Sequence, residues 1–341
     1  MRLFSIVKDN NKRKIYFLDK HIITYKKGVK LFSKYTTCNY KNKYFLNRLI
    51  KSHKKSHQRI FDYLKKYLYA LDSNLNISVT PSENIKVWQV WLQGNNTEVL
   101  NKRMPLIVEK CLNSVKGHNP NLEIILLTED NIRDYVDFPD YIWEKYLSGN
   151  ITRTHFSDLI RFYLLYKYGG IWCDATVYMT DRIPDSVINA DLFVFKDMIA
   201  SRIDNNISLE QFILLCNSQN IGPWTNSISF IRAKAGDIII GNLIKLLYEY
   251  WKYESSTVQY LFANYFLSYI LFNNSECRME FIKIQNELTT VEYGLLQKCL
   301  FEHYDEEIFE SIKKITPIHK LTYKDLDKDV MPDSFYKFLT K

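Results

Sequence analysis

The stretch SDLIRFYLLYKYGGIWCDATV (Ser157–Val177) is typical of an amphipathic helix that turns directly into a strand. Its apolar residues recur at helical spacing and end at Gly169–Gly170, the only adjacent pair among ten glycines. IWCDATVYM (Ile171–Met179) then indicates one strand with a single carboxylate, Asp174. Ligands of open α/β sheets bind beyond the carboxyl ends of the strands, so this pattern places Asp174 where a ligand would bind.

The flanking sequence alternates between strand and helix patterns. Strands are expected at residues 85–92, 123–128 and 191–196, helices at 105–117 and 140–149, and mostly helices after residue 238. Pro105 fits the first helical position of its helix, and Gly117 fits the position after the last. The alternation predicts an α/β fold with a largely parallel sheet.

The composition is that of a soluble globular chain. Of 341 residues, 46% are apolar and 25% charged. The longest strongly apolar stretch, Tyr260–Phe272, is shorter than the roughly 20 residues that span a membrane, and no secretory signal is expected. Six cysteines lie far apart with no C-x-x-C pair, which favours reduced thiols and a cytoplasmic location.

Charge is distributed unevenly along the chain. Residues 1–75 hold 19 Lys and Arg against 4 Asp and Glu, a balance of +15, so the rest carries −7 of the net +8. We expect a basic module at 1–75, made of strands around the turn DNNK and a helix from about residue 43, then a catalytic domain at 76–255 and a helical region at 256–341 that closes the site. The module predicts a polyanionic partner, although lysines that merely solvate the surface explain the charge as well.

Asp158 and Arg161 lie three residues apart and share one face of the predicted helix. They fit a surface salt bridge, or an acid and a base that together bind the hydroxyl groups of a sugar. The sequence contains no G-x-S-x-G, H-E-x-x-H, G-x-x-x-x-G-K-[ST] or G-x-G-x-x-G motif, which argues against the enzyme classes that depend on them.

Taken together, SDLIR and LYKYGGIWCDAT resemble the sugar-binding region of DxD-type glycosyltransferases, closest to the capsular polysaccharide synthesis branch related to α-mannosyl- and α-galactosyltransferases. KVWQVWLQG, NYFLSYILF and HKLTYK are similar to further segments of that family, so the resemblance spans about residues 85–325. It implies a GT-A fold, which is Rossmann-like, and a nucleotide diphosphate sugar as donor. It also implies transfer of a hexose to a polysaccharide or lipid-linked saccharide, mostly with retention of the anomeric configuration.

The resemblance implies the catalytic residues. Asp158 and Arg161 match the pair that holds the donor sugar, and Asp174 matches the first acid of DxD, near the ribose and the metal-bound diphosphate. Thr176 stands at the second acid. Asp174 and Thr176, at i and i+2 of one strand, are therefore expected to face the same side and to hold Mn²⁺ or Mg²⁺.

Five further residues are implied in substrate binding. Trp91 matches the aromatic residue that stacks on the nucleotide base, with Gln93 close by, and Trp172 matches a packing aromatic beside the acidic motif. His319 and Lys320 are candidates for the diphosphate side. As single residues, the two tryptophans also fit a simple core and Asp174 a turn cap.

The expected protein is therefore a glycosyltransferase of surface polysaccharide synthesis, held at the inner face of the cell membrane by residues 1–75. The expected partners are the nucleotide sugar, the saccharide acceptor and anionic lipid, without nucleic acid. The alternatives are a sugar-phosphate transferase of the same pathway and, in a different class, a nucleic-acid-binding protein that uses its basic N-terminal segment.

Overall fold

The structure is a computed structural model that describes residues 59–92, 104–196, 227–284, 290–324 and 330–341, together with three strands near the N-terminus. These strands form an antiparallel sheet in the order β1-β2-β3. Their bounds are Phe4–Asp9, Lys12–Phe17 and Lys20–Lys26. The strands expected around the turn DNNK are thereby confirmed.

A five-stranded sheet with the order β5-β4-β6-β9-β8 forms the centre of the protein. Its strands are β4 (Lys86–Val90), β5 (Glu123–Leu127), β6 (Gly170–Cys173), β8 (Leu192–Phe195) and β9 (Ser227–Ala233). β4 is parallel to β5 and β6, whereas β9 is antiparallel to β6 and β8. The α/β class and the largely parallel sheet are confirmed: because β8 is antiparallel to β9, four of the five strands run in one direction and β9 alone is reversed. Strands buried on both faces are apolar whatever their direction, so the sequence pattern did not reveal the antiparallel pairings.

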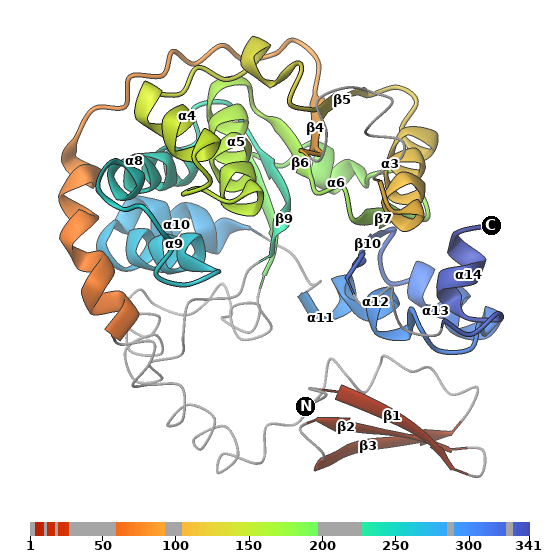
Figure 1. Ribbon diagram of the computed structural model, residues 1–341. Coiled ribbons are helices and arrows are strands. Elements are labelled where there is room, and N and C mark those ends of the chain that lie inside the picture. The colour runs from red at the N-terminus through yellow and green to blue at the C-terminus, as the bar shows by residue number, and fades with distance from the viewer. Residues whose placement is uncertain are drawn as a thin grey trace.

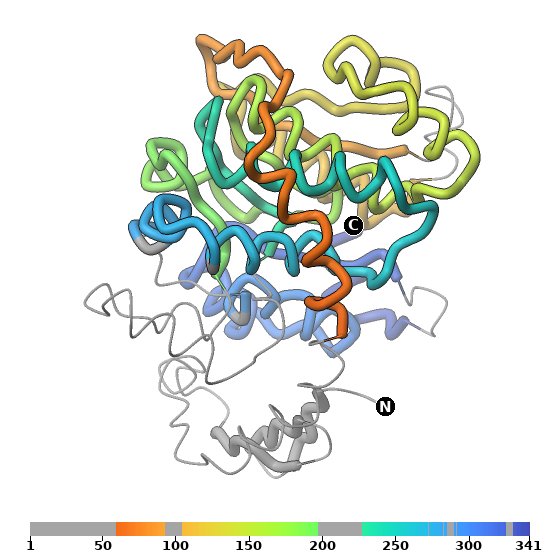
Figure 2. Tube along the Cα trace, turned by 90° about the vertical axis from the view of Figure 1, so that its left-hand side faces the viewer, coloured from red at the N-terminus to blue at the C-terminus, as the bar shows by residue number. Residues whose placement is uncertain are grey.

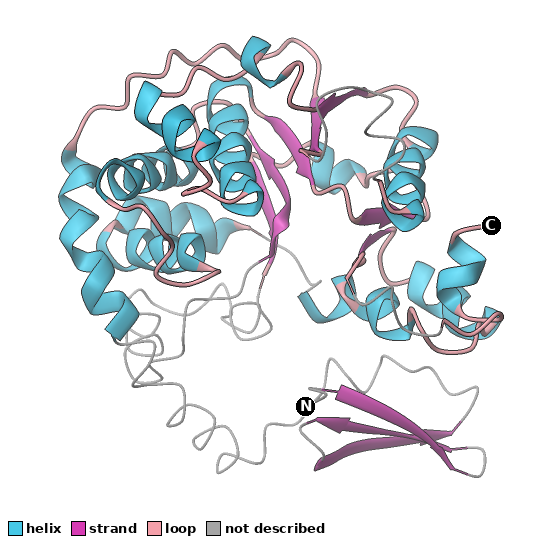
Figure 3. Cartoon of the chain, viewed as in Figure 1, coloured by secondary structure: helices cyan, strands magenta, loops and turns pink. Residues whose placement is uncertain are grey.

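Helices cover both faces of this sheet (Figures 1 and 3). Alternate strand residues point to opposite faces. Trp88, Trp172 and Ile231 pack in the larger core with α4, α5, α8, α9 and α10, and Val87 and Ile171 pack in another core with residues of α3 and α6. These helices are α3 (Leu106–His118), α4 (Asp140–Leu147), α5 (Arg153–Tyr168), α6 (Asp185–Ile188), α8 (Ile238–Tyr253), α9 (Phe262–Asn273) and α10 (Ser275–Lys283).

The C-terminal part is mostly helical, as expected, and adds one short strand. It contains α11 (Thr290–Tyr293), α12 (Leu295–Cys299), α13 (Glu306–Lys313), β10 (Ile318–Lys320) and α14 (Phe335–Leu339). None of the helices in the described part of the chain is both long and apolar enough to span a membrane.

The continuous strand expected at 171–179 is wrong. β6 ends at Cys173, and a tight turn follows in which the Val177 N–H donates to the Asp174 carbonyl at 2.9 Å. The chain then leaves the central sheet as β7 (Val177–Met179) and pairs antiparallel with β10. Asp is favoured in turns, and a period-two pattern cannot distinguish one strand from two short ones on either side of a turn.

Helix α3 is shifted from the expectation: it begins at Leu106, with Pro105 as its N-cap residue, and extends two residues past the end expected from Gly117. Its last residue is His118, so Gly117 lies inside the helix and Asn119 follows it. The Asn119 side chain donates to the carbonyl of Val115, which satisfies one of the last carbonyls of the helix.

Gly169 and Gly170 are both required at the junction of α5 and β6. Their φ angles are 71° and 102°, a region that other residues rarely adopt. A Cβ on Gly169 would lie 2.7 Å from the Ala235 nitrogen, and one on Gly170 would lie 2.4 Å from the Lys86 carbonyl. The glycine pair therefore lets the helix pass directly into the centre of the sheet, which fixes where β6 begins.

The segment before the predicted boundary at residue 75 packs against the main body. Residues 59–64 are helical and continue into a 3-10 helix, η1 (Lys65–Asp72). Leu64, Tyr67 and Ala70 are buried in the same core as α8 and α9, and Figure 2 shows the segment crossing both helices. The domain boundaries stay predictions, but residues 59–72 belong to the main core.

Candidate functional site

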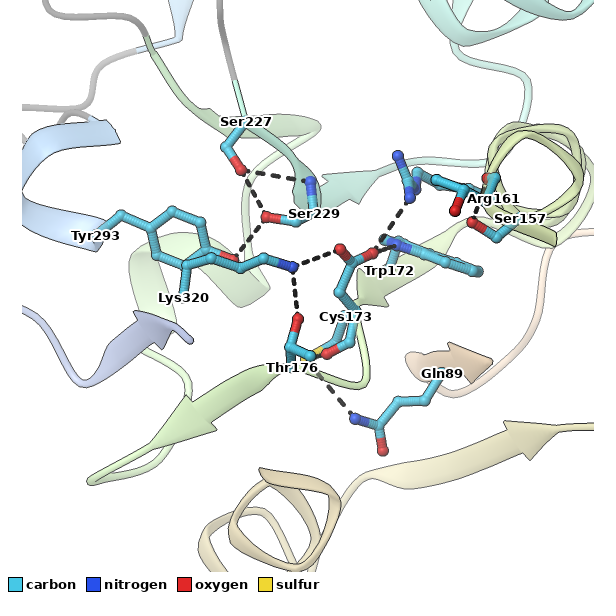
Figure 4. Close-up of polar contacts among 12 residues, drawn as sticks. Gln89, Ser157, Arg161, Trp172, Cys173, Thr176, Ser227, Ser229, Tyr293 and Lys320 are labelled. Carbon is cyan, nitrogen blue, oxygen red and sulfur yellow. Dashed lines mark hydrogen bonds and ion pairs between the residues drawn. The ribbon is translucent and has the colours of Figure 1, made fainter. Parts of the chain in front are cut away.

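Asp174 lies directly after β6, and Figure 4 labels the partners that surround it, among them Arg161, Trp172 and Lys320. Its backbone N–H donates to the Ser229 carbonyl of β9 at 2.8 Å. Its Oδ1 accepts hydrogen bonds from Trp172 Nε1 at 2.7 Å and from Arg161 Nη2 at 3.2 Å. Its Oδ2 accepts from Lys320 Nζ at 2.6 Å. The carboxylate is thus fixed by three donors, yet its side chain keeps 24% of its surface exposed.

Asp158 and Arg161 reach this point from α5, one turn apart. Arg161 Nη1 lies 3.0 Å from Asp158 Oδ1, and both residues are buried. The surface salt bridge that the spacing also allowed is therefore not what forms. The Arg161 guanidinium lies 4.9 Å from the centre of the Trp172 ring, close enough for a cation–π contact. The structure thus brings together all three residues predicted to be catalytic.

Lys320 comes from the far end of the chain. Antiparallel pairing sets Lys320 opposite Val177, and the Leu321 N–H donates to the Thr176 carbonyl at 2.8 Å. Lys320 Nζ therefore donates both to Asp174 Oδ2 and to Thr176 Oγ1, each at 2.6 Å. The side chains of Asp174 and Thr176 both contact the Lys320 ammonium, so they do face the same side. They lie in a turn, however, and not along one strand.

His319 lies on the opposite face of β10. It is fully buried, and its Nε2 lies 3.0 Å from Thr180 Oγ1. Burial lowers the pKa of His319 to about 3, so the imidazole is neutral. Of the two residues predicted on the diphosphate side, the structure brings Lys320 to Asp174 and not His319.

The two carboxylates of the site have pKa values shifted in opposite directions. Burial raises the pKa of Asp158 to about 6, with the nearby Asp174 charge adding to the effect and Arg161 opposing it. Burial also acts to raise the pKa of Asp174, but Lys320 and Arg161 outweigh it and leave that pKa below its ordinary value. Asp174 is therefore the firmly ionised carboxylate of the pair.

The predicted aromatic residues are buried. Trp172 is fully buried and holds Asp174 through its indole N–H. Trp91 is 5% exposed, its ring meets Tyr323 edge to face at 5.5 Å, and it packs in a third core with α3 and the C-terminal helices. Its role in base stacking stays a prediction. Gln93 lies outside the described residues.

Sequence reasoning missed the residues that support Asp174 from the other side. Ser229 accepts the Asp174 N–H through its carbonyl, and its hydroxyl lies 2.9 Å from the Tyr293 hydroxyl and 2.6 Å from that of Ser227 (Figure 4). Isolated serines and a tyrosine in a four-residue helix form no motif. Only the pairing of β6 with β9 shows that they belong to the site.

The residues at the end of β6 do not fit a resident divalent cation. Such cations prefer several oxygen ligands, usually with more than one carboxylate. Here the two predicted ligands are one carboxylate and one hydroxyl, and both already accept hydrogen bonds from the Lys320 ammonium. Within the described ranges, no three His, Cys, Asp or Glu side chains gather in a way that could hold a metal ion.

Comparison with known proteins finds two similar glycosyltransferases. A glycosyltransferase named afumC from Aspergillus fumigatus is 31% identical over 100 residues, which are 28% of this chain and 25% of that protein. An O-glycosyltransferase named braB from Annulohypoxylon truncatum is 30% identical over 115 residues, 31% of this chain and 26% of that protein. The chain thus matches only about a quarter of the length of each relative.

The family match is much longer. It covers residues 39–339, which extends beyond the resemblance at residues 85–325 in both directions, and it begins inside the segment predicted as a basic module. It includes every residue of the site. The chain belongs to the family of capsular polysaccharide synthesis proteins.

Proposed function

We propose that the protein is a glycosyltransferase that moves a hexose from a nucleotide diphosphate sugar to a polysaccharide or lipid-linked saccharide. One observation carries the proposal: Asp158, Arg161 and Asp174, singled out in the sequence, are joined by ion pairs at the end of β6, and Lys320 joins them from β10. This is the edge of an α/β sheet at which ligands bind. The two similar glycosyltransferases support the same class of reaction.

The arrangement suits both halves of such a donor. A hexose offers hydroxyl groups that donate and accept hydrogen bonds, and Asp158 and Arg161 supply an acceptor and donors side by side. The leaving diphosphate develops negative charge, which Arg161 and Lys320 stabilise at no cost of reorganisation because Asp174 already holds both cations. The main task of the protein is then to position donor and acceptor.

The finer assignments follow the resemblance. The sheet and its covering helices form a GT-A type domain, Trp91 and Gln93 belong to the residues that bind the donor, and the hexose is transferred with retention of configuration. Because Trp91 is only 5% exposed and packs against Tyr323, a base can stack on its ring only if these neighbours move. The anomeric proton of the product, measured by NMR, reports retention or inversion directly.

The basic N-terminal segment provides the contact with an anionic membrane, where a lipid-linked acceptor is located at the cytoplasmic face. Each Lys or Arg near such a surface contributes about 1 kcal/mol. Residues 59–72 pack into the main core, so the deletion that tests this role ends at residue 58. Loss of binding to acidic vesicles with donor hydrolysis retained is expected, whereas equal vesicle binding by the shortened protein would exclude this role.

A transfer assay with two labels tests the reaction itself. Candidate donors carry one label in the hexose and another in the phosphate next to it, and Asp174→Asn serves as the inactive control. Hexose label alone in the product is expected. Both labels in the product would make the protein a sugar-phosphate transferase, and neither label from any nucleotide sugar would refute the proposal.

A further inference from the structure

The Lys320 ammonium occupies the position between the two residues that the family resemblance assigns to a metal. Its Nζ lies 2.6 Å from Asp174 Oδ2 and 2.6 Å from Thr176 Oγ1. A cation cannot bind these same two oxygens while the ammonium is there. The structure therefore places a fixed positive charge where a metal-dependent site would place a divalent ion.

The net charge of this arrangement matches that of a metal site. A DxD pair carries −2 and a divalent cation +2, which sum to zero. Here Asp174 carries −1, Thr176 is neutral and Lys320 carries +1, which again sum to zero. Threonine in place of the second acid and lysine in place of the metal thus compensate each other, and a divalent ion added beside Lys320 would leave an excess of like charges.

Lys320 is held firmly enough to act in this way. β10 pairs with β7, and the residues on either side of Lys320, His319 and Leu321, are buried and anchor the strand. Asp174 is itself fixed by Trp172 Nε1. The ammonium therefore does not need to be recruited by the donor, which is what preorganised electrostatic stabilisation requires.

The ammonium also keeps donor capacity for a ligand. A lysine ammonium has three N–H donors. Among the described residues, Lys320 donates to Asp174 and Thr176, which leaves one N–H for a ligand. Its side chain is 27% exposed. The Thr176 hydroxyl accepts from Lys320 and can still donate its own proton. A phosphate oxygen that approaches from the exposed side meets both donors.

We infer that Lys320, positioned by Asp174 and Thr176, supplies the charge that holds the donor diphosphate in place of a divalent cation. The inference rests on the proposed function, because it assumes a nucleotide diphosphate ligand. It makes the protein independent of added metal. It also means that Lys320 and Thr176 together take the place of a metal and its second acid. Thr176→Asp combined with Lys320→Ala should therefore create a two-carboxylate metal site.

Calorimetric titration with UDP and GDP, each in the presence of EDTA or of MnCl₂, tests the inference. The proteins are wild type, Lys320→Met, Thr176→Asp/Lys320→Ala and the matched control Lys324→Met, which removes a nearby exposed lysine that does not contact Asp174. A melting curve of each variant verifies folding. Mn²⁺ alone is titrated as well, so that metal binding is measured without nucleotide or activity.

Wild type and Lys324→Met are expected to bind the nucleotide equally well in EDTA and in manganese, and to bind no Mn²⁺ tightly by themselves. Lys320→Met is expected to bind about tenfold more weakly in both conditions, since a charge-assisted hydrogen bond is lost. The double variant is expected to gain Mn²⁺ binding and nucleotide binding that requires it.

Two results would overturn the inference and leave the proposed function standing: nucleotide binding by wild type that disappears in EDTA and returns with manganese, or unchanged affinity in Lys320→Met. Absence of nucleotide diphosphate binding by wild type in both conditions would refute the proposed function, and the inference with it.

Discussion

Two charged clusters of this protein use the same chemical groups in different surroundings. In the site cluster, Asp158 and Asp174 pair with two cations, and the connecting Arg161 side chain is only 4% exposed. In the second cluster, Glu254 Oε1 at the end of α8 accepts hydrogen bonds from Tyr63 at 2.6 Å and Lys66 at 2.8 Å, and also from Tyr67, while Lys66 is 50% exposed. The second cluster joins the segment 59–72 to the main body.

The carboxylates Asp174 and Glu254 are similarly exposed, 24% and 20%, so the difference lies in their partners: Arg161 is buried, whereas Lys66 is half exposed. At the surface, water screens charges, and an ion pair contributes little beyond holding two segments together. In the interior the same pair is costly unless every partner is present, so removal of one partner has large effects. Substitutions in the site cluster should therefore reduce both transfer activity and the free energy of unfolding, whereas the Glu254 cluster should tolerate substitution.

The largest effect is expected for Asp174→Asn. The amide keeps the shape but loses the charge that holds Arg161 and Lys320 together. Transfer should fall by about two orders of magnitude or more, as for other preorganised electrostatic groups. Initial rates with the labelled donor measure the loss, and circular dichroism verifies that the variant is folded. Activity within about twofold of wild type would show that Asp174 has no part in the reaction.

Arg161→Met should be the most damaging change for stability. It leaves the buried Asp158 without its counter-ion and removes one of the two cations at Asp174. Removal of one partner of a buried ion pair costs about 3–5 kcal/mol. Urea unfolding measures the free energy. A loss below about 1 kcal/mol would mean that the cluster is hydrated, like the one around Glu254.

The pH dependence of stability should distinguish the two carboxylates of the site. The folded pKa of Asp158, about 6, exceeds its ordinary value near 4, so the folded state holds the proton more tightly. Wild type should therefore lose stability through this group, on the order of 3 kcal/mol, as the pH rises from about 4 to 6. Asp174, with its lowered pKa, contributes in the opposite sense and loses its contribution as the pH falls below about 4.

Comparison of wild type with Asp158→Asn isolates the first effect, because asparagine does not titrate. Urea unfolding at several pH values between 4 and 7 gives the difference. It should change steadily between pH 4 and 6 and become constant above that range. A difference that does not vary with pH would place the pKa of Asp158 at its ordinary value.

The smallest effect is expected for Glu254→Gln. The pKa of Glu254 is about 2: burial alone would raise it, but hydrogen bonds from Lys66, Tyr63 and Tyr67 outweigh burial. Its contribution is therefore complete above pH 4.5 and is lost as the pH falls towards 2. The substitution should cost about 1 kcal/mol near neutral pH and leave transfer unchanged. A loss of transfer as large as that of Asp174→Asn would contradict the separation of the two clusters.

Much of the site could be predicted from the sequence because it is local. Asp158, Arg161 and Asp174 lie within 17 residues, and the helix, the glycine pair and the strand between them fix their relative positions. The contact of Lys320 with Asp174 could not be derived in this way, since it depends on β10 pairing with β7 across more than 130 residues. Only the family resemblance pointed to Lys320.

The errors have the same physical origin. The reversed direction of β9 and the turn that begins at Asp174 do not change the apolar periodicity, which depends on burial and not on chain direction. Ser229 and Tyr293 were missed because each reaches the site through tertiary pairing alone. Sequence reasoning was strongest where one continuous segment forms the site and weakest where distant segments complete it.

Calorimetric titration of wild type and Asp174→Asn with UDP-, GDP- and CMP-sugars tests the central claim most directly. CMP-sugars carry a single phosphate and serve as the matched control for the diphosphate. A nucleotide diphosphate sugar should bind wild type and bind Asp174→Asn at least about tenfold more weakly, a difference of about 1.4 kcal/mol. Equal affinity of the two proteins for every nucleotide sugar would contradict the assignment of this site.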